Sequence, residues 1–541
     1  MQFVFGPEKQ AFQFNYFKDG SLEYAVHQDP FVVDLNADGI DEVIFGGLET
    51  QPNTPENFSD LSLTVGGWQN GEFKDLTSQY LPGENADISG VGQIVPGDYD
   101  ADGDVDIFLS AYADMDHVFS AYWLRNDGQS FSKIDLGTRA AWQHGAATAD
   151  INNDGYADVL AVGYGAGDEV IPDGYSDGPA VYLGSEAGLI LKQMETWQGF
   201  GSGVALADFL GNGSTTAVIS DAFILAGSDG RAQDTVLASI NVEAESVSLE
   251  RISSLPTPSL EFDQGAPNGS HDVRVLALEF SGDNLTDVVI LSRADNVDGI
   301  WPLVSTMQFL RNEGEGVFSD VTATFVGGFD TETGIAYHPI VKDLDGNGLV
   351  DIFNSAFEYG NDKQYSSTSI LSQEEIGKWV NVGRTELSAL TPENSTMSAI
   401  AEGPDEQTYL IHLNKTYGSP SLVSTRVIQV FQNLESGSYT LEVILNLTNS
   451  PVFLDGLIET VTESAHTIEY QGNTYDYSAV QDLITTVSRD GEFTSEFAAE
   501  IAESFPDSAG ISYSTAVALI GQANMESTLL AVAGADGNYV G

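Results

Sequence analysis

The side chains in this sequence with the most recognisable chemistry are acids spaced two residues apart in short loops. The run DYDADGDVD, residues 98–106, has a carboxylate at every odd position. Calcium is a hard ion that takes six to eight oxygen ligands, and a tight turn directs alternate side chains inward. This run therefore predicts a calcium site. Its expected ligands are the side chains of Asp98, Asp100, Asp102 and Asp106 and the carbonyl of Asp104.

Three other loops repeat this pattern with an amide in place of one acid, so about four calcium ions are expected. Their expected ligands, with the seventh residue contributing its carbonyl, are Asp34, Asn36, Asp38, Ile40 and Glu42; Asp150, Asn152, Asp154, Tyr156 and Asp158; and Asp343, Asp345, Asn347, Leu349 and Asp351. The alternative for each loop is a turn rich in Asp and Asn that holds no ion.

These loops differ from the loop of an EF-hand. Their last carboxylate stands at the ninth position, whereas an EF-hand loop places its final acid at the twelfth. The flanking residues favour strands rather than helices. Gly103 and its counterparts at the sixth position permit the sharp bend. We therefore expect calcium to stabilise hairpin loops rather than to act as a signal.

The loops belong to a longer repeat of apolar strand, acidic loop and apolar strand. Four complete and two degenerate copies recur roughly 60 residues apart, a period that fits one four-stranded propeller blade. The degenerate loops begin at Asp208 and Glu279 and carry Leu210 and Ser281 at the third position, so calcium is not expected there. A seventh unit contains Glu402, with its loop shortened to a turn.

Each unit also contains alternating apolar residues around a Gly or Asn turn, which predicts an outer hairpin. Examples surround Trp68, Trp123 and Phe309, and the hairpin of the seventh unit is expected from Val427. In its loops and hairpins the chain resembles the FG-GAP/VCBS family of propeller repeats, which also form the heads of integrin α-subunits. Four loops match the family pattern D-x-[DN]-x-[DN]-G-x-x-[DE] in full, and the resemblance covers roughly residues 20–448.

The resemblance implies an all-β fold, a seven-bladed β-propeller over residues 1–448 with calcium-binding hairpin loops. From residue 449 the apolar residues recur at intervals of three and four. This spacing predicts a small α-rich C-terminal domain over residues 449–541, with a role in export, anchoring or docking.

Four histidines are expected to precede the first strand of a unit. They are His27, His144, His271 and His338. The family resemblance implies that the first strand lines the central channel and that the calcium loop follows at its far end, so these imidazoles would surround one mouth of the channel. With Trp142 they form a candidate ligand face for a sugar or a transition metal. The alternative is that they cap strands or fill a wet channel.

The charge of the chain restricts its partners. It contains 81 acidic and 19 basic residues, a formal net charge of −62. Such a surface repels phosphates and anionic lipids, and no apolar run reaches about 18 residues, so neither nucleic acid nor direct membrane insertion is expected. The absence of cysteine excludes disulfides and thiol catalysis.

The N-terminus lacks the basic and apolar regions of a secretory signal. Because cytosolic calcium would rarely fill extracellular-type sites, we expect an extracellular or cell-surface protein, exported by a type I-like route without a cleaved N-terminal signal. A virion surface is the alternative location.

The expected function is a binding or adhesion module that recognises a glycan or a surface protein, with possible self-assembly through the C-terminal domain. An enzyme is not expected, because the sequence contains no recognised catalytic motif. One alternative is a structural subunit of a surface layer, filament or virion appendage. The other is a propeller-based enzyme that cleaves polysaccharides.

Overall fold

The structure of the chain is a computed structural model. It describes residues 4–5, 9–15, 25–27, 30–49, 63–86, 88, 91–111, 119–128, 130–139, 142–164, 179–194, 201–221, 235–243, 246–256, 270–294, 304–326, 339–344, 347–354, 369–382, 395–404, 407–415, 422–431, 438–440, 467–470 and 473–476.

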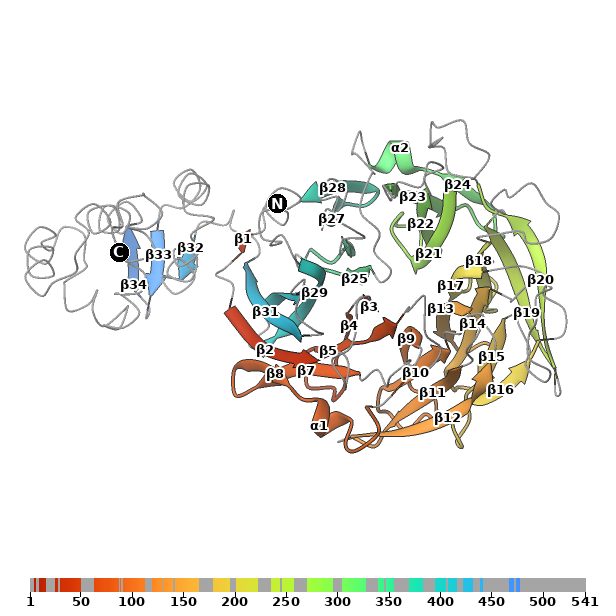
Figure 1. Ribbon diagram of the computed structural model, residues 1–541. Coiled ribbons are helices and arrows are strands. Elements are labelled where there is room, and N and C mark those ends of the chain that lie inside the picture. The colour runs from red at the N-terminus through yellow and green to blue at the C-terminus, as the bar shows by residue number, and fades with distance from the viewer. Residues whose placement is uncertain are drawn as a thin grey trace, which may run out of the picture.

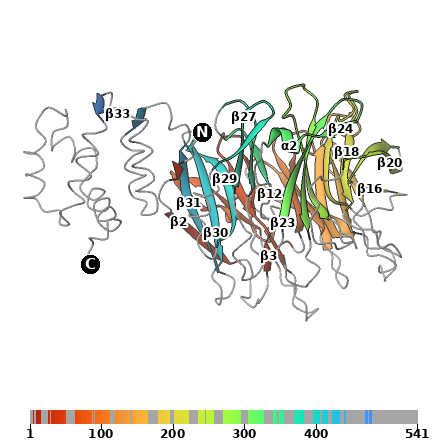
Figure 2. The same ribbon diagram turned by 90° about the horizontal axis from the view of Figure 1, so that it is seen from above.

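Six antiparallel sheets of four strands surround a common centre as the blades of a β-propeller (Figures 1 and 2). In each blade the first strand lies toward the centre of the ring and the fourth toward its edge (Figure 1). Blades 1 to 3 consist of β4 (Phe31–Val33), β5 (Glu42–Phe45), β7 (Thr64–Gln69) and β8 (Glu72–Asp75); β9 (Val91–Gly97), β10 (Asp106–Ala111), β11 (Phe119–Asn126) and β12 (Phe131–Arg139); and β13 (Trp142–Ala149), β14 (Asp158–Tyr164), β15 (Ala180–Leu183) and β16 (Ile190–Gln193).

Blades 4 to 6 repeat this order, and a short ladder of β3 (Ala25–His27) with β6 (Gly47–Glu49) lies beyond the first hairpin of blade 1. Blades 4 to 6 consist of β17 (Gly201–Ala207), β18 (Thr216–Asp221), β19 (Val236–Val242) and β20 (Val247–Ser254); β21 (Ser270–Leu278), β22 (Asp287–Ala294), β23 (Val304–Asn312) and β24 (Phe318–Asp320); and β25 (Ile340–Lys342), β26 (Asp351–Asn354), β27 (Ser369–Glu375) and β28 (Lys378–Val382).

The core lies between the blades. Buried clusters join each consecutive pair of the six blades, so the second strands are covered on both faces and read as apolar runs rather than as alternating patterns. Between blades 2 and 3 the rings of Phe108 and Tyr182 lie 4.8 Å apart, beside the buried side chains of Tyr99 and Trp123. The stacking of apolar strands fixes the angle at which each acidic loop meets the next blade.

A further sheet brings the N-terminus to the end of the repeat region. It contains β29 (Ser395–Gly403), β30 (Gln407–Lys415) and β31 (Leu422–Phe431). The N-terminal strands β1 (Val4–Phe5) and β2 (Lys9–Asn15) both pair antiparallel with β31. Phe12 of β2 lies against Phe45 and Phe73 of blade 1, with ring centroids 6.5 and 5.8 Å apart.

The outer hairpin predicted from Val427 is wrong. β32 (Ser438–Thr440) pairs in parallel with β33 (Thr467–Tyr470), which pairs with β34 (Asn473–Asp476), and β2 takes the place beside β31. Ala11 and Phe12 of β2 reach the buried cluster shared with blade 1. An alternating pattern specifies a strand but not its partner, and here the partner is distant in sequence and adds apolar side chains to the shared cluster.

The predicted helical domain, residues 449–541, lies outside the described residues except for β33 and β34, which fall between its predicted helices. In the described part of the chain the helices α1 (Thr77–Tyr80) and α2 (Thr322–Phe325) are single turns. No helix in that part is long and apolar enough to cross a membrane.

A three-way polar contact joins blades 1 and 6 to the sheet of β29–β31. The ammonium of Lys342 lies 3.0 Å from Asp41 Oδ2 and 3.5 Å from Glu402 Oε1. The backbone N–H of Glu402 donates to the same Asp41 oxygen at 2.7 Å, and the N–H of Asp41 donates to the Glu402 carbonyl at 2.9 Å. Because these groups are partly buried, the contact is stronger than an exposed ion pair.

Replacing Lys342 with Met should lower the free energy of unfolding by about 1–2 kcal/mol, because two neighbouring carboxylates lose their shared cation. Lys378→Met is the matched control, since Lys378 in the same blade pairs with Glu374 at 3.0 Å on an exposed surface. Its loss should cost less than about 0.5 kcal/mol. Urea unfolding of both variants would measure the difference. Equal losses of unfolding free energy would show that the three-way contact stabilises the fold no more than an exposed ion pair does.

Candidate metal centre

The acidic loops join the first and second strands of the six blades and share one backbone conformation. In blade 2 the fourth loop residue, Ala101, has a φ of 56° and the sixth, Gly103, a φ of 96°. A Cβ on Gly103 would meet no atom within 4 Å, so the left-handed conformation rather than packing selects glycine. The degenerate loop of blade 5 keeps the same two left-handed positions, at Gly282 and Asn284. The loop shape therefore does not depend on a full set of acids.

In five of the six loops the first acid holds the turn by accepting two backbone N–H groups of that turn. The carboxylate of Asp98 accepts the N–H groups of Asp102 and Gly103, both at 3.1 Å. In the degenerate loop of blade 4, Asp208 accepts the two equivalent N–H groups. The same pair of bonds is made by Asp34, Asp150 and Asp343. Each of these first acids is thus part of the turn as well as a predicted ligand.

The ninth acid is buried and accepts backbone donors from two directions. Asp106 Oδ2 accepts the N–H of Tyr99 at 3.2 Å, and its Oδ1 accepts the N–H of Asn126, at the end of the third strand, at 2.7 Å. The same arrangement recurs at Asp158, Asp287 and Asp351. These carboxylates therefore tie the loop to the rest of the blade.

Burial perturbs the ionisation of these acids. It raises the pKa of Asp106 to about 7, although the N–H groups of Asn126 and Tyr99 oppose the shift. Burial likewise raises the pKa of Glu42 to about 7 and that of Asp158 to about 6. Carboxylates held in this way gain from a nearby cation, because the cation offsets the desolvation of the charged form.

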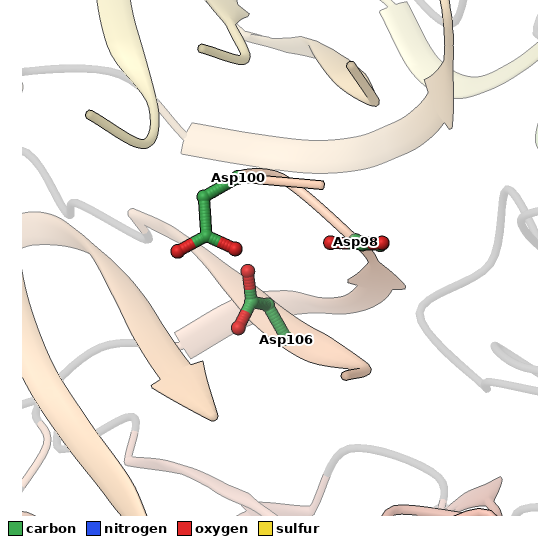
Figure 3. A group of neighbouring side chains, drawn as sticks. All are labelled: Asp98, Asp100 and Asp106. Carbon is green, nitrogen blue, oxygen red and sulfur yellow. The ribbon is translucent and has the colours of Figure 1, made fainter. Parts of the chain in front are cut away.

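Blade 2 brings three carboxylates into one group (Figure 3). Asp98, Asp100 and Asp106 each offer an oxygen within 4.8 Å of the others. Asp100 Oδ1 is buried and has no hydrogen-bond partner among the described residues. Burial raises the pKa of Asp100, and the negative charges of Asp102 and Asp98 add to the shift. A buried carboxylate oxygen without a donor, beside two other carboxylates, suits a divalent cation.

The donor set fits calcium. All the ligands offered are hard oxygens, and two further predicted ligands, Asp102 and the carbonyl of Asp104, lie in the same loop. Asp102 Oδ1 already accepts the N–H of Asp104 at 3.0 Å, which keeps the turn closed. Magnesium requires a stricter octahedron and retains its own waters, so a loop with flexible ligands favours calcium.

Comparison with known proteins identifies the repeat. Residues 98–161, which run from the acidic loop of blade 2 into the second strand of blade 3, match the FG-GAP-like repeat. This chain is a β-propeller that contains an FG-GAP-like repeat. FG-GAP repeats commonly bind calcium, which agrees with the acidic group in blade 2. No curated protein matches the chain.

The FG-GAP propeller is also similar to solved structures at low identity. A complex of BT0996 with RGII is 8% identical, with a TM-score of 0.28, over 80% of this protein and 93% of that one. The Dos1 propeller is 10% identical, with a TM-score of 0.33, over 77% of this protein and 95% of that one. The NanB sialidase from Streptococcus pneumoniae is 10% identical, with a TM-score of 0.33, over 77% of this protein and 70% of that one.

In two other complete loops of the FG-GAP propeller, an amide bonds to an acid. Asn152 Nδ2 donates to Asp154 Oδ2 at 2.8 Å. Asn36 Nδ2 donates to the Tyr80 hydroxyl at 3.1 Å and lies 3.4 Å from Glu42 Oε1. In blade 6, Asp345 lies outside the described residues. Among the described loops, blade 2 is thus the one in which three carboxylates converge.

The structure describes the backbone of four of the five residues in the predicted ligand face. Trp142 and His144 lie in β13 and His271 lies in β21, in each case at the end of the first strand that is farther from the acidic loop. His27 ends β3, which pairs with β6 at the corresponding end of blade 1. His338 lies outside the described residues. The backbone therefore places the four described residues at equivalent ends of their blades.

The residues that connect neighbouring loops were not predicted from the sequence. Asn126 and Asn312 end the third strands of blades 2 and 5, in the repeated segments LRNDG and LRNEG. Asn126 Nδ2 donates to the carbonyl of Leu35 in blade 1, and Asn312 Nδ2 donates to the carbonyl of Phe209 in blade 4, both at 2.9 Å. The recurrence of these two segments was the signal that could have revealed them.

Substituting Asp287 by Ala should lower the free energy of unfolding by roughly 2–4 kcal/mol, because three backbone N–H groups, of Phe280, Ser281 and Asn312, lose their acceptor. The loss should be the same with calcium and with chelator, since blade 5 has a degenerate loop. Asp283→Ala, an exposed change in the same loop, should cost less than about 1 kcal/mol. If urea unfolding shows equal losses of unfolding free energy for Asp287→Ala and Asp283→Ala, the ninth acid has no structural role.

Proposed function

We propose that this FG-GAP propeller is an extracellular binding or adhesion module, stabilised by calcium, that recognises a glycan or a surface protein. The observation that carries the proposal is the convergence of Asp98, Asp100 and Asp106 inside the matched repeat. Extracellular modules bind calcium with a Kd of about 10⁻⁴–10⁻³ M, so such loops are filled outside the cell. A net charge of −62 strengthens the case, because bound cations reduce the repulsion within the fold.

The same proposal includes a calcium ion in each of the four complete loops, in blades 1, 2, 3 and 6. The side chains of these loops support it, since all four carry oxygen ligands at the first, third, fifth and ninth positions. In the loops with an amide, calcium binding requires the amide to present its oxygen rather than its N–H group to the ion. We therefore expect blade 2 to bind calcium most tightly.

We further propose that the sheet of β29–β31 is the seventh blade. Ala399 and Ile411 share a buried cluster with Val43 and Phe45 of blade 1, which supports this position. Lys342 of blade 6 reaches Glu402 in the same sheet. The pairing of β1 and β2 with β31 then closes the ring, because hydrogen bonds join its first and last segments.

The partner is proposed to bind the face opposite the acidic loops. Trp142 and His144 flank Gln143, which is fully buried. The Gln143 carbonyl accepts the Ser110 hydroxyl at 3.0 Å, and its Oε1 accepts the N–H of Ala111 at 3.0 Å. These bonds fix the end of β13 against blade 2, so an aromatic and an imidazole are carried by a rigid strand. An aromatic residue and an imidazole carried by such a strand suit a carbohydrate or a polar protein surface.

Calcium measured on dialysed full-length protein should amount to about four ions per chain, and chelation should lower the melting temperature. Binding at a hundredfold excess over Kd adds about 2.7 kcal/mol per site. Asp100→Asn should remove one ion, whereas Asp283→Asn in a degenerate loop should remove none. Zero or one ion in the wild type, or an unchanged melt after complete removal of calcium, would contradict the proposal.

The ligand face can be tested by replacing Trp142, His144, His271 and His338 together with Ala. Binding to a glycan array should be lost, while the calcium-dependent rise in melting temperature should remain, because the acidic loops lie at the other ends of the blades. The Asp283→Asn variant serves as the control that binds normally. Retained binding in the fourfold variant would exclude this face, and cleavage of a polysaccharide panel by the wild type would replace the binding function with an enzymatic one.

A further inference from the structure

A continuous path of hydrogen bonds links the ninth acids of blades 1 and 2. Asp106 Oδ1 accepts the N–H of Asn126 at 2.7 Å, and Asn126 Nδ2 donates to the carbonyl of Leu35 at 2.9 Å. The N–H of Leu35 in turn donates to Glu42 Oε2 at 2.9 Å. All four residues are buried, with at most 3% of their surface exposed. Asp106 and Glu42 are the last predicted ligands of two different calcium loops.

We propose that Asn126 couples the calcium loops of blades 1 and 2, so that an ion in one loop raises the affinity of the other. This inference rests on the proposed calcium binding. An ion held by Asp98, Asp100 and Asp106 restrains the Asp106 carboxylate and with it the backbone of Asn126. The Asn126 amide then restrains the Leu35 peptide, which positions Glu42 for the ion of blade 1. A buried, closely packed path transmits such a restraint, because its members have no room to adjust independently.

The coupling works equally in both directions. A calcium ion on Glu42 restrains the Leu35 peptide, and the same two bonds carry that restraint back to Asp106. Thermodynamic linkage requires that each ion raise the affinity of the other by the same factor. Coupling of this kind is commonly fivefold or more between linked sites.

The contacts of Asn126 recur at Asn312 between blades 5 and 4, but neither of these blades has a complete acidic loop. Asp287 Oδ1 accepts the N–H of Asn312 at 2.8 Å, and Asn312 Nδ2 donates to the carbonyl of Phe209 at 2.9 Å. The path then ends on the hydroxyl of Thr216, which accepts the N–H of Phe209 at 3.3 Å. Asn312 therefore makes the same structural contacts as Asn126, but the loops that it joins are both degenerate.

The two asparagines are matched in their remaining contacts. Asn126 Nδ2 donates also to the carbonyl of Val105 at 3.1 Å, and Asn312 Nδ2 to that of Thr286 at 3.0 Å. Each side-chain oxygen accepts the N–H of the glycine two residues later, at 3.0 and 2.9 Å. Replacing either asparagine with Ala should therefore cost the metal-free protein the same stability.

Blades 2 and 3 are joined differently. Asp158 Oδ1 accepts the N–H of Gly184 at 2.7 Å, and the next residue, Ser185, donates its backbone N–H to the carbonyl of Tyr99 at 3.2 Å. The contact that crosses from blade 3 to blade 2, between Ser185 and Tyr99, joins two backbone groups. A side-chain change at Asn126 therefore tests the link between blades 1 and 2 without disturbing the link between blades 2 and 3.

The test compares three full-length proteins from which calcium has been removed: the wild type, Asn126→Ala and Asn312→Ala. Calcium is titrated in a calorimeter, and native mass spectrometry counts the bound ions. Both variants should lower the melting temperature of the metal-free protein alike. Only Asn126→Ala should also weaken calcium binding, raising the apparent Kd of at least one ion about fivefold or more. Identical calcium titrations for the two variants would overturn the coupling.

The variant Asp100→Asn keeps the hydrogen-bond path and provides a second test if Asn126→Ala does not fold. Emptying the loop of blade 2 should remove one ion and weaken a second, and adding Asn126→Ala should weaken that second ion no further. If Asp100→Asn loses one ion but binds all the others with unchanged affinity, the coupling is overturned, whereas the proposed calcium binding still stands. A wild type that binds no calcium would refute the proposed calcium function itself, and the titration shows this before any variant is compared.

Discussion

In four of the six blades, a buried carboxylate accepts backbone N–H groups from its own loop and from the third strand or the residue after it, and this contact holds the blade together. Moving a carboxylate into the interior is costly, and the raised pKa values of Asp106, Glu42 and Asp158 reflect that cost. Backbone donors offset it, because hydrogen bonds to a charged acceptor are stronger than those between neutral groups. The acid thereby orders three separate segments of a blade: loop, second strand and third strand.

The degenerate loops show which part of this arrangement is structural. Blade 5 keeps Asp287 and its backbone bonds although its loop lacks a full ligand set. In blade 4 the hydroxyl of Thr216 accepts the loop N–H at 3.3 Å and donates to the carbonyl of Ala207 at 3.0 Å. A neutral hydroxyl can thus replace the acid in closing a loop. The acids at the third and fifth positions would serve the proposed ion, whereas the first and ninth also hold the fold.

Repulsion among acids is the general constraint on a chain with a net charge of −62. Calcium in the complete loops would reduce this repulsion locally. Where the loop is shortened to a turn at Glu402, a side-chain cation is used instead, since Lys342 contacts both Glu402 and Asp41. The contacts between blade 1 and the sheet of β29–β31 therefore combine the N-terminal strands, an apolar cluster and one lysine, none of which depends on a metal.

The sequence by itself determined the repeated unit and the local shape of the loops. Acids at alternate positions, a glycine at the sixth and flanking apolar strands act over nine residues, so the turn at Asp98 and its copies could be predicted from local chemistry. The tertiary structure alone decided which strands pair and which side chains meet. β31 takes β2 rather than the segment after Val427, and Asn126 reaches Leu35 in the preceding blade. Such contacts join residues far apart in sequence, and their choice depends on the total apolar surface and the hydrogen bonds that the closed ring can satisfy together, which no local pattern records.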